Sequence, residues 1–111
     1  MSALNLIVFP VSDLERATML YTALLGVEPY MSGPYYAGFR VDDQEIGLDP
    51  NGHQKASGPI AYRDVPDLRA AIDTLIAAGA TVAQDATDVG GGLMVALLAD
   101  DDGNTLGLRQ A

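Results

Sequence analysis

The apolar positions in the first half of the chain change from strand to helix periodicity. Residues 3–9 carry no charge and are rich in β-branched and aromatic side chains, which predicts a buried strand that Pro10 ends. A helix is expected next, ending at Gly26, because apolar residues recur at helical spacing at Leu14, Ala17, Tyr21 and Leu24. Ser12 and Glu15 have the spacing of a capping box, so we expect Ser12 to begin this helix.

Shorter apolar segments follow this helix and predict strands. They lie near 27–31, 35–41 and 45–49, and polar turns at 32–34 and 42–44 separate them. Residues 50–59 are polar and rich in Gly and Pro, which is typical of a linker.

The second half of the chain repeats this order of elements. A strand at 60–63 precedes a helix at 67–78, which Gly79 ends and whose apolar face consists of Leu68, Ala71, Ile72 and Leu75. Further strands are predicted at 81–83, 93–99 and 104–109.

Two short phrases recur at matching places in the halves. Val11-Ser12-Asp13-Leu14 returns as Val65-Pro66-Asp67-Leu68, and Ile46-Gly47-Leu48 returns as Leu106-Gly107-Leu108. Neither half could bury an apolar sheet face alone, so the two should pack as one unit. The sequence therefore predicts a single α+β domain over residues 1–111, made of two tandem βαβββ modules, 1–50 and 58–111, with a linker at 51–57.

Composition narrows the classes of partner. The formal net charge is −9, from 15 acidic residues against six Lys and Arg, and such a surface repels nucleic acid and anionic membranes. The chain has no cysteine and no apolar run of about 20 residues, and its N-terminus lacks a basic leader segment. We therefore expect a cytoplasmic protein without thiolate chemistry.

The strand–helix–three-strand order, the Val-x-Asp-Leu phrases, Leu24-Leu25-Gly26-Val27 and the Asp102-Gly103-Asn104 turn resemble one superfamily. It is the vicinal oxygen chelate superfamily, which contains glyoxalase I, bleomycin resistance proteins and extradiol dioxygenases. The resemblance covers nearly the whole chain. It implies a cup-shaped mixed sheet of the glyoxalase/bleomycin-resistance kind.

The resemblance also implies where a metal would bind. Family enzymes hold a divalent ion with His, Gln or Glu on the first and last strand of each module. The matching positions here are Leu6, Gly47, Ile60 and Gly107, and none of these has a side-chain donor. We therefore expect no metal or other cofactor.

The two glycines at these positions allow two interpretations. They could enlarge a ligand cavity, or they could relieve crowding against aromatic side chains that point inward. Tyr62 shares a strand face with Ile60, and it is the best candidate for lining the cup. Tyr35 or Tyr36 could join it, with Phe9 or Phe39.

Carboxylates and a histidine give two further candidates for chemistry. Glu45 and Asp49 flank Gly47 at strand spacing, so one of them could act as a general base or bind a cationic ligand, or both could be solvated at strand ends. His53 is the only histidine, and its polar neighbours indicate a solvated loop residue.

Three functional hypotheses remain open. The first is a metal-free, homodimeric binding protein for a small, partly aromatic ligand, on the model of bleomycin resistance proteins, which sequester a drug without transforming it. The second is a lyase, isomerase or dioxygenase-type enzyme of the same superfamily with a non-standard site. A third hypothesis is a domain whose pocket has collapsed and which serves only for interaction.

Overall fold

The computed structural model describes residues 3–51 and 58–111. The chain forms two compact units. One consists of Asn5–Ile60, and the other consists of Ala61–Ala111 together with the N-terminal residues up to Leu4. His53 lies outside the described residues.

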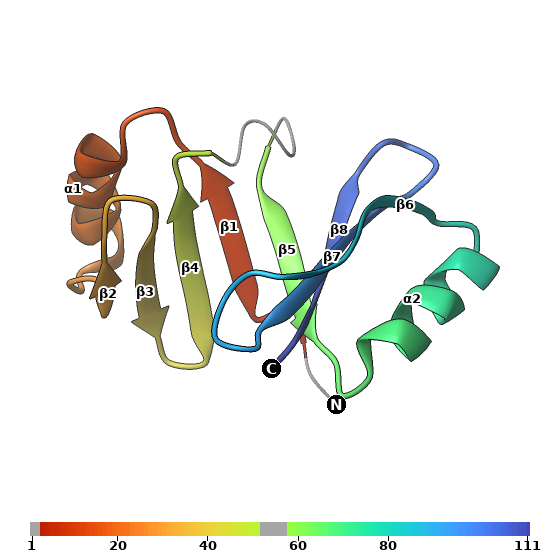
Figure 1. Cartoon of the computed structure of the whole chain (residues 1–111). Coiled ribbons are helices and arrows are strands. Elements are labelled where there is room, and N and C mark those ends of the chain that lie inside the picture. The colour runs from red at the N-terminus through yellow and green to blue at the C-terminus, as the bar shows by residue number, and fades with distance from the viewer. Residues whose placement is uncertain (1–2, 52–57) are drawn as a thin grey trace. The chain divides into compact units, whose positions relative to one another are not determined.

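The unit Asn5–Ile60 contains one helix and a four-stranded sheet (Figure 1). Its elements are β1 (Leu6–Pro10), α1 (Leu14–Leu25), β2 (Met31–Ser32), β3 (Ala37–Val41) and β4 (Gln44–Asp49). The strands lie in the order β2-β3-β4-β1. The β1–β4 pair is parallel, whereas β2–β3 and β3–β4 are antiparallel.

The second unit repeats this arrangement. Its elements are β5 (Ile60–Asp64), α2 (Leu68–Ala77), β6 (Thr81–Asp88), β7 (Met94–Ala99) and β8 (Thr105–Gln110). The order is β5-β8-β7-β6, with a parallel β5–β8 pair and antiparallel β6–β7 and β7–β8 pairs. The predicted α+β fold of two βαβββ modules is therefore confirmed.

Two strands differ most in extent from the prediction. The strand expected near 27–31 is only Met31–Ser32, and the preceding Pro29 has no backbone N–H to give to a sheet. The strand expected at 81–83 extends over Thr81–Asp88. This strand lies at an edge of the sheet and is mostly exposed, so its apolar alternation is weak.

The repeated aspartate of the Val-x-Asp-Leu phrase begins each helix. The Asp13 carboxylate accepts a hydrogen bond from the Arg16 backbone N at 3.1 Å, and Asp67 accepts one from the Ala70 backbone N at 3.0 Å. The prediction that Ser12 and Glu15 form a capping box was therefore wrong, because Asp13 holds the N-cap position. The Asp13 carboxylate accepts from a backbone N–H of the first helical turn, which is the role of an N-cap side chain.

Each helix packs its apolar face onto its own sheet. On α2 the predicted residues Leu68, Ala71, Ile72 and Leu75 all pack into the core of the second unit. On α1, Leu14, Ala17 and Tyr21 pack into the core of the first unit, but Leu25 takes the place expected for Leu24, which is 72% exposed. Neither helix in the described part of the chain has the length and apolarity to cross a membrane.

Candidate functional site

The sheet of the unit Asn5–Ile60 has one side covered by α1 and one side that faces away from it. Phe39, Ile46 and Leu48 point toward α1 and form the core there. Side chains alternate along a strand, so the intervening residues lie on the opposite side. We call this side the Gly47 face, and it carries Leu6, Val8, Gly38, Arg40, Glu45 and Gly47.

Two tyrosines cover the glycines of the Gly47 face. A Cβ built on Gly47 would overlap the hydroxyl oxygen of Tyr36 and stand 2.6 Å from its Cζ. A Cβ on Gly38, the register partner of Gly47, would stand 3.0 Å from the phenol of Tyr30. The absence of side chains at positions 38 and 47 is therefore what allows these rings to lie against the sheet.

A polar network lies beside these rings. The Tyr30 hydroxyl donates to Glu45 Oε1 at 3.1 Å, and the Arg40 guanidinium lies 4.1 Å from the centre of the Tyr30 ring. Arg40 Nε is also 3.4 Å from the same Glu45 oxygen. These three side chains hold one another through a hydrogen bond, an ion pair and a cation–π contact.

The second unit has an equivalent surface, on the side of its sheet that faces away from α2. We call it the Gly107 face, and it carries Tyr62, Asp64, Val95, Leu97, Gly107 and Arg109. Tyr62 is the register partner of Gly107, and a Cβ on Gly107 would stand 2.7 Å from the Tyr62 Cγ. Beside this pair, Arg109 Nε lies 2.5 Å from Asp64 Oδ1 and Nη2 lies 3.2 Å from Oδ2.

The residues that the sequence proposed for ligand contact belong to two different units. Leu6, Tyr36, Glu45 and Gly47 belong to one face in the first unit, and Tyr62 and Gly107 to the equivalent face in the second. Ile60 is a buried residue at the start of β5. The geometry favours the crowding interpretation of the two glycines, because a tyrosine takes the space at each one.

Three of the proposed aromatic residues are buried in or against the core, or are largely exposed. The prediction that Phe39 lines a ligand site was wrong, because its side chain is fully buried in the core beneath α1. Phe9 packs against the same core, with its ring centre 5.2 Å from that of Tyr21. Tyr35 is 75% exposed, so it makes little contact with the fold.

Arg40, Tyr30 and Gly38 on the Gly47 face were not among the residues proposed from the sequence. Tyr30 lies before β2, and its backbone N–H donates to the Gly38 carbonyl at 2.9 Å, next to the pairing of Met31 with Gly38. Strand alternation does place Gly38 and Arg40 together, which is the one sequence signal that pointed to them.

The donor set at the family's metal positions does not fit a divalent ion. Leu6 offers no lone pair, and a donor side chain at Gly47 or Gly107 would meet the tyrosine that lies there. Among the described residues, no group of three or more His, Cys, Asp or Glu lies close enough to hold a metal.

Comparison with models of protein families shows which superfamily contains this chain. Residues 3–108 match the model of the Glyoxalase/Bleomycin resistance protein/Dioxygenase superfamily. The chain belongs to this superfamily. No curated protein matches the sequence closely enough to be a relative.

Solved structures share the superfamily fold at low identity. A protein titled NAD-dependent benzaldehyde dehydrogenase from Legionella pneumophila is 20% identical, with a TM-score of 0.80 and coverage of 95% of this chain and 96% of that one. A superfamily member from Vibrio splendidus is 15% identical, with a TM-score of 0.72 and coverage of 96% and 97%. A Mn(II)-bound glyoxalase from Novosphingobium aromaticivorans is 17% identical, with a TM-score of 0.68, covering 99% of this chain but 40% of that one.

Proposed function

We propose that this superfamily member is a metal-free protein that binds a small, partly aromatic molecule against its tyrosine-covered sheet faces. The observation that carries the proposal is the Tyr36–Gly47 contact. At a position where family enzymes have a metal-binding side chain, this chain has a glycine and the hydroxyl of a tyrosine. An aromatic ring with one polar end suits a flat organic ligand, which it can contact by stacking and by a hydrogen bond.

Sequestration without turnover is the mode of action that we propose, and bleomycin resistance proteins are its model within the superfamily. We also propose that the protein is a cytoplasmic homodimer. An exposed apolar stripe on α1 supports the dimer, because Met19, Leu20 and Leu24 are 70%, 65% and 72% exposed. Neighbouring exposed apolar side chains on one helix are typical of a contact surface.

A superfamily enzyme with Glu45 as general base is less well supported. The Glu45 oxygen Oε1 is already engaged by the Tyr30 hydroxyl and lies beside Arg40. These contacts suit a structural role that fixes Tyr30 in place. The same contacts weigh against Glu45 as the site of a cationic ligand, because Arg40 already provides the cation.

The metal part of the proposal is tested by elemental analysis of the purified protein and by thermal unfolding with Zn²⁺, Mn²⁺, Fe²⁺, Ni²⁺ and Mg²⁺. We expect no stoichiometric metal and no rise in Tm. A tightly bound divalent ion at one per chain would overturn the proposal.

The ligand part is tested by thermal unfolding against a panel of aromatic natural products. A ligand at about 100 times its Kd adds about 2.7 kcal/mol to stability, which is a readily measured shift in Tm. The matched variants are Tyr36→Ala and Tyr35→Ala, since adjacent tyrosines differ in their contact with Gly47. We expect Tyr36→Ala to abolish the shift and Tyr35→Ala to retain it. If both variants keep the shift, the ligand does not bind to the Gly47 face.

A further inference from the structure

The exposed side of α1 consists of two adjacent rows of residues. Side chains four positions apart lie on the same face of a helix, and the six residues in these rows are exposed while the rest of α1 is partly buried. Met19, Leu20 and Leu24 are each at least 65% exposed, so much of this face is apolar. We call it the α1 outer face, and it consists of Glu15, Met19 and Ala23 in one row and Arg16, Leu20 and Leu24 in the other.

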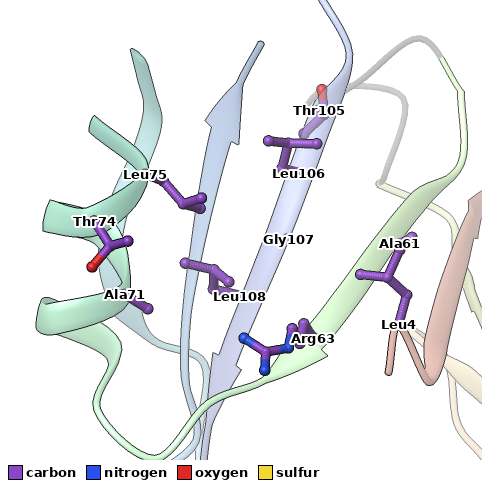
Figure 2. Close-up of a pocket in the computed structure, with 10 residues that line it drawn as sticks. All are labelled: Leu4, Ala61, Arg63, Ala71, Thr74, Leu75, Thr105, Leu106, Gly107 and Leu108. Atoms are coloured by element: carbon purple, nitrogen blue, oxygen red, sulfur yellow. The ribbon is translucent and has the colours of Figure 1, made fainter. Parts of the chain in front are cut away.

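The equivalent helix of the second unit has no such face. Most apolar side chains of α2 pack into the core, and Figure 2 shows Leu75 directed toward Leu106 and Leu108 of β8. Along Leu68–Ala77, Ile76 is the one large apolar side chain at an exposed position. The apolar outer surface is therefore a property of α1, and the fold common to both units does not require it.

A groove of about 510 Å³ borders the α1 outer face. It lies between α1 and the turn at 32–34, where Glu15 and Met19 line it from the helix and Pro34 lines it from the turn. The groove is beside the N-terminal half of α1, whereas the projecting Leu24 is at the C-terminal end. A Leu24 side chain therefore reaches this groove only from a second copy of the chain.

The charges on α1 favour an antiparallel neighbour. Arg16 is in the first turn, where the positive end of the helix dipole is unfavourable for a cation. The last turn has no basic residue, and the exposed Glu28 follows shortly after it. The ion pairs within the described part of the chain do not include Arg16. An antiparallel second copy brings Arg16 to a helix end where both the dipole and a carboxylate stabilise a cation.

We infer that two copies of the chain pack α1 against α1 in antiparallel directions, about a two-fold axis that passes between Met19 and Leu20. The inference rests on the homodimer proposed above and names its contact. In this arrangement Leu24 faces the partner's Glu15 and enters the groove beside it. Arg16 faces the partner's Ala23, whose small side chain leaves room for the guanidinium to reach the end of that helix. Each contact occurs twice, as the self-complementary interface of a two-fold dimer requires.

Single cysteines test the contact, because the chain has none of its own. Helices pack about 8–10 Å apart, so residues beside the two-fold axis come close enough for a disulfide. On oxidation of the whole chain with copper phenanthroline, Leu20→Cys should form a covalent dimer, and Ile76→Cys on α2 should not. Sedimentation establishes the state of the wild type. A monomer would overturn this contact together with the homodimer, whereas a dimer in which Leu20→Cys is not cross-linked would overturn this contact alone.

Two further cysteine variants establish the direction of the helices. In the antiparallel pair the two copies of Arg16 are separated by seven residues of helix rise, about 10 Å, which is too far for a disulfide. Arg16→Cys alone should therefore give no covalent dimer, but a mixture of Arg16→Cys and Ala23→Cys should give a mixed one, which mass spectrometry identifies. A covalent dimer of Arg16→Cys alone would show a parallel contact and overturn the inference.

Charge reversal gives an independent test by sedimentation. Glu28→Arg makes the net charge of −9 less negative and so reduces general repulsion between copies. It should nevertheless raise the Kd of the dimer about tenfold, because it places a second cation beside Arg16 at both ends of the contact. The double variant with Arg16→Glu and Glu28→Arg should recover most of the affinity of the wild type. Dimerisation of Glu28→Arg at the wild-type Kd would overturn the antiparallel contact.

Discussion

The ring of Tyr62 lies directly over Gly107, its register partner on the neighbouring strand. A Cβ on Gly107 would stand 2.5 Å from Cδ2 and 2.7 Å from Cγ, so the overlap involves the part of the ring nearest the backbone. The pair in the first unit is different, because there the nearest atom over Gly47 is the hydroxyl end of Tyr36. A hydroxyl end can swing aside, whereas Cγ is fixed by the strand.

We therefore predict that Gly107→Ala is the more damaging of the two matched substitutions. It should lower the free energy of unfolding by about 1–3 kcal/mol, the usual cost of overpacking. Gly47→Ala should cost less than about 1 kcal/mol, because restriction of the unfolded chain offsets part of the strain. Urea unfolding measures both. In a Tyr62→Ala background, Gly107→Ala should no longer lower the free energy of unfolding. If the loss of stability is unchanged in that background, Tyr62 is not its source.

The helix starts give a second prediction. Asp13→Ala and Asp67→Ala should each cost about 0.5–2 kcal/mol of stability, because each removes the acceptor for a backbone N–H of the first turn. Ser12→Ala is the control and should change stability by less than about 0.5 kcal/mol, as substitutions at exposed positions usually do. Urea unfolding of the three variants measures the differences. Equal losses for Ser12→Ala and Asp13→Ala would restore the capping box that the sequence first predicted.

The repeat explains why so much of the fold was predictable. Two copies of Val-x-Asp-Leu indicated two helix starts, and in the structure each aspartate caps its helix. The register was harder to predict, because a slip of one residue exchanges the two faces of a strand. Phe39 illustrates this. Its pairing with Ile46 places the Phe39 side chain toward α1, and this orientation is known only from the observed register.

For the candidate site, the sequence predicted which positions of the chain take part, but not which side chains lie beside them. The repeat located Gly47 and Gly107, but nothing local in the sequence shows that Tyr36 and Tyr62 occupy the space beside them.

Acidic pH should weaken the hairpin between β7 and β8. The Asn104 side chain and then its backbone N–H donate to the Asp100 carboxylate, each at 2.8 Å, and hold the pKa of Asp100 below its ordinary value of 3.8. A lowered pKa in the folded state stabilises the protein above that ordinary value. The contribution is lost as pH falls through the folded-state pKa.

Asp100→Asn should therefore be less stable than the wild type at neutral pH, and the difference should shrink as pH falls below about 4. Urea unfolding between neutral pH and pH 3 measures it. Asp101→Asn, in the same turn, is the control for the change in net charge. A difference between wild type and Asp100→Asn that stays constant over this range would show that the hydrogen bonds to Asp100 do not depend on its charge.

The exposed apolar stripe on α1 leads to the last prediction. Leu24 is 72% exposed on this helix, whereas its neighbour Leu25 packs into the core, so substitution of the two should have separable effects. We expect the wild type to sediment at twice its 11.6 kDa chain mass, and Leu24→Glu to sediment as a monomer with unchanged helix content. Leu25→Ala should instead lower stability by about 0.5–3 kcal/mol, because Leu25 is partly buried and packs against the core. Ile76→Glu on α2, 46% exposed, is the control for an added surface charge and should remain dimeric. A dimer that survives Leu24→Glu would show that the stripe on α1 is not the contact between subunits.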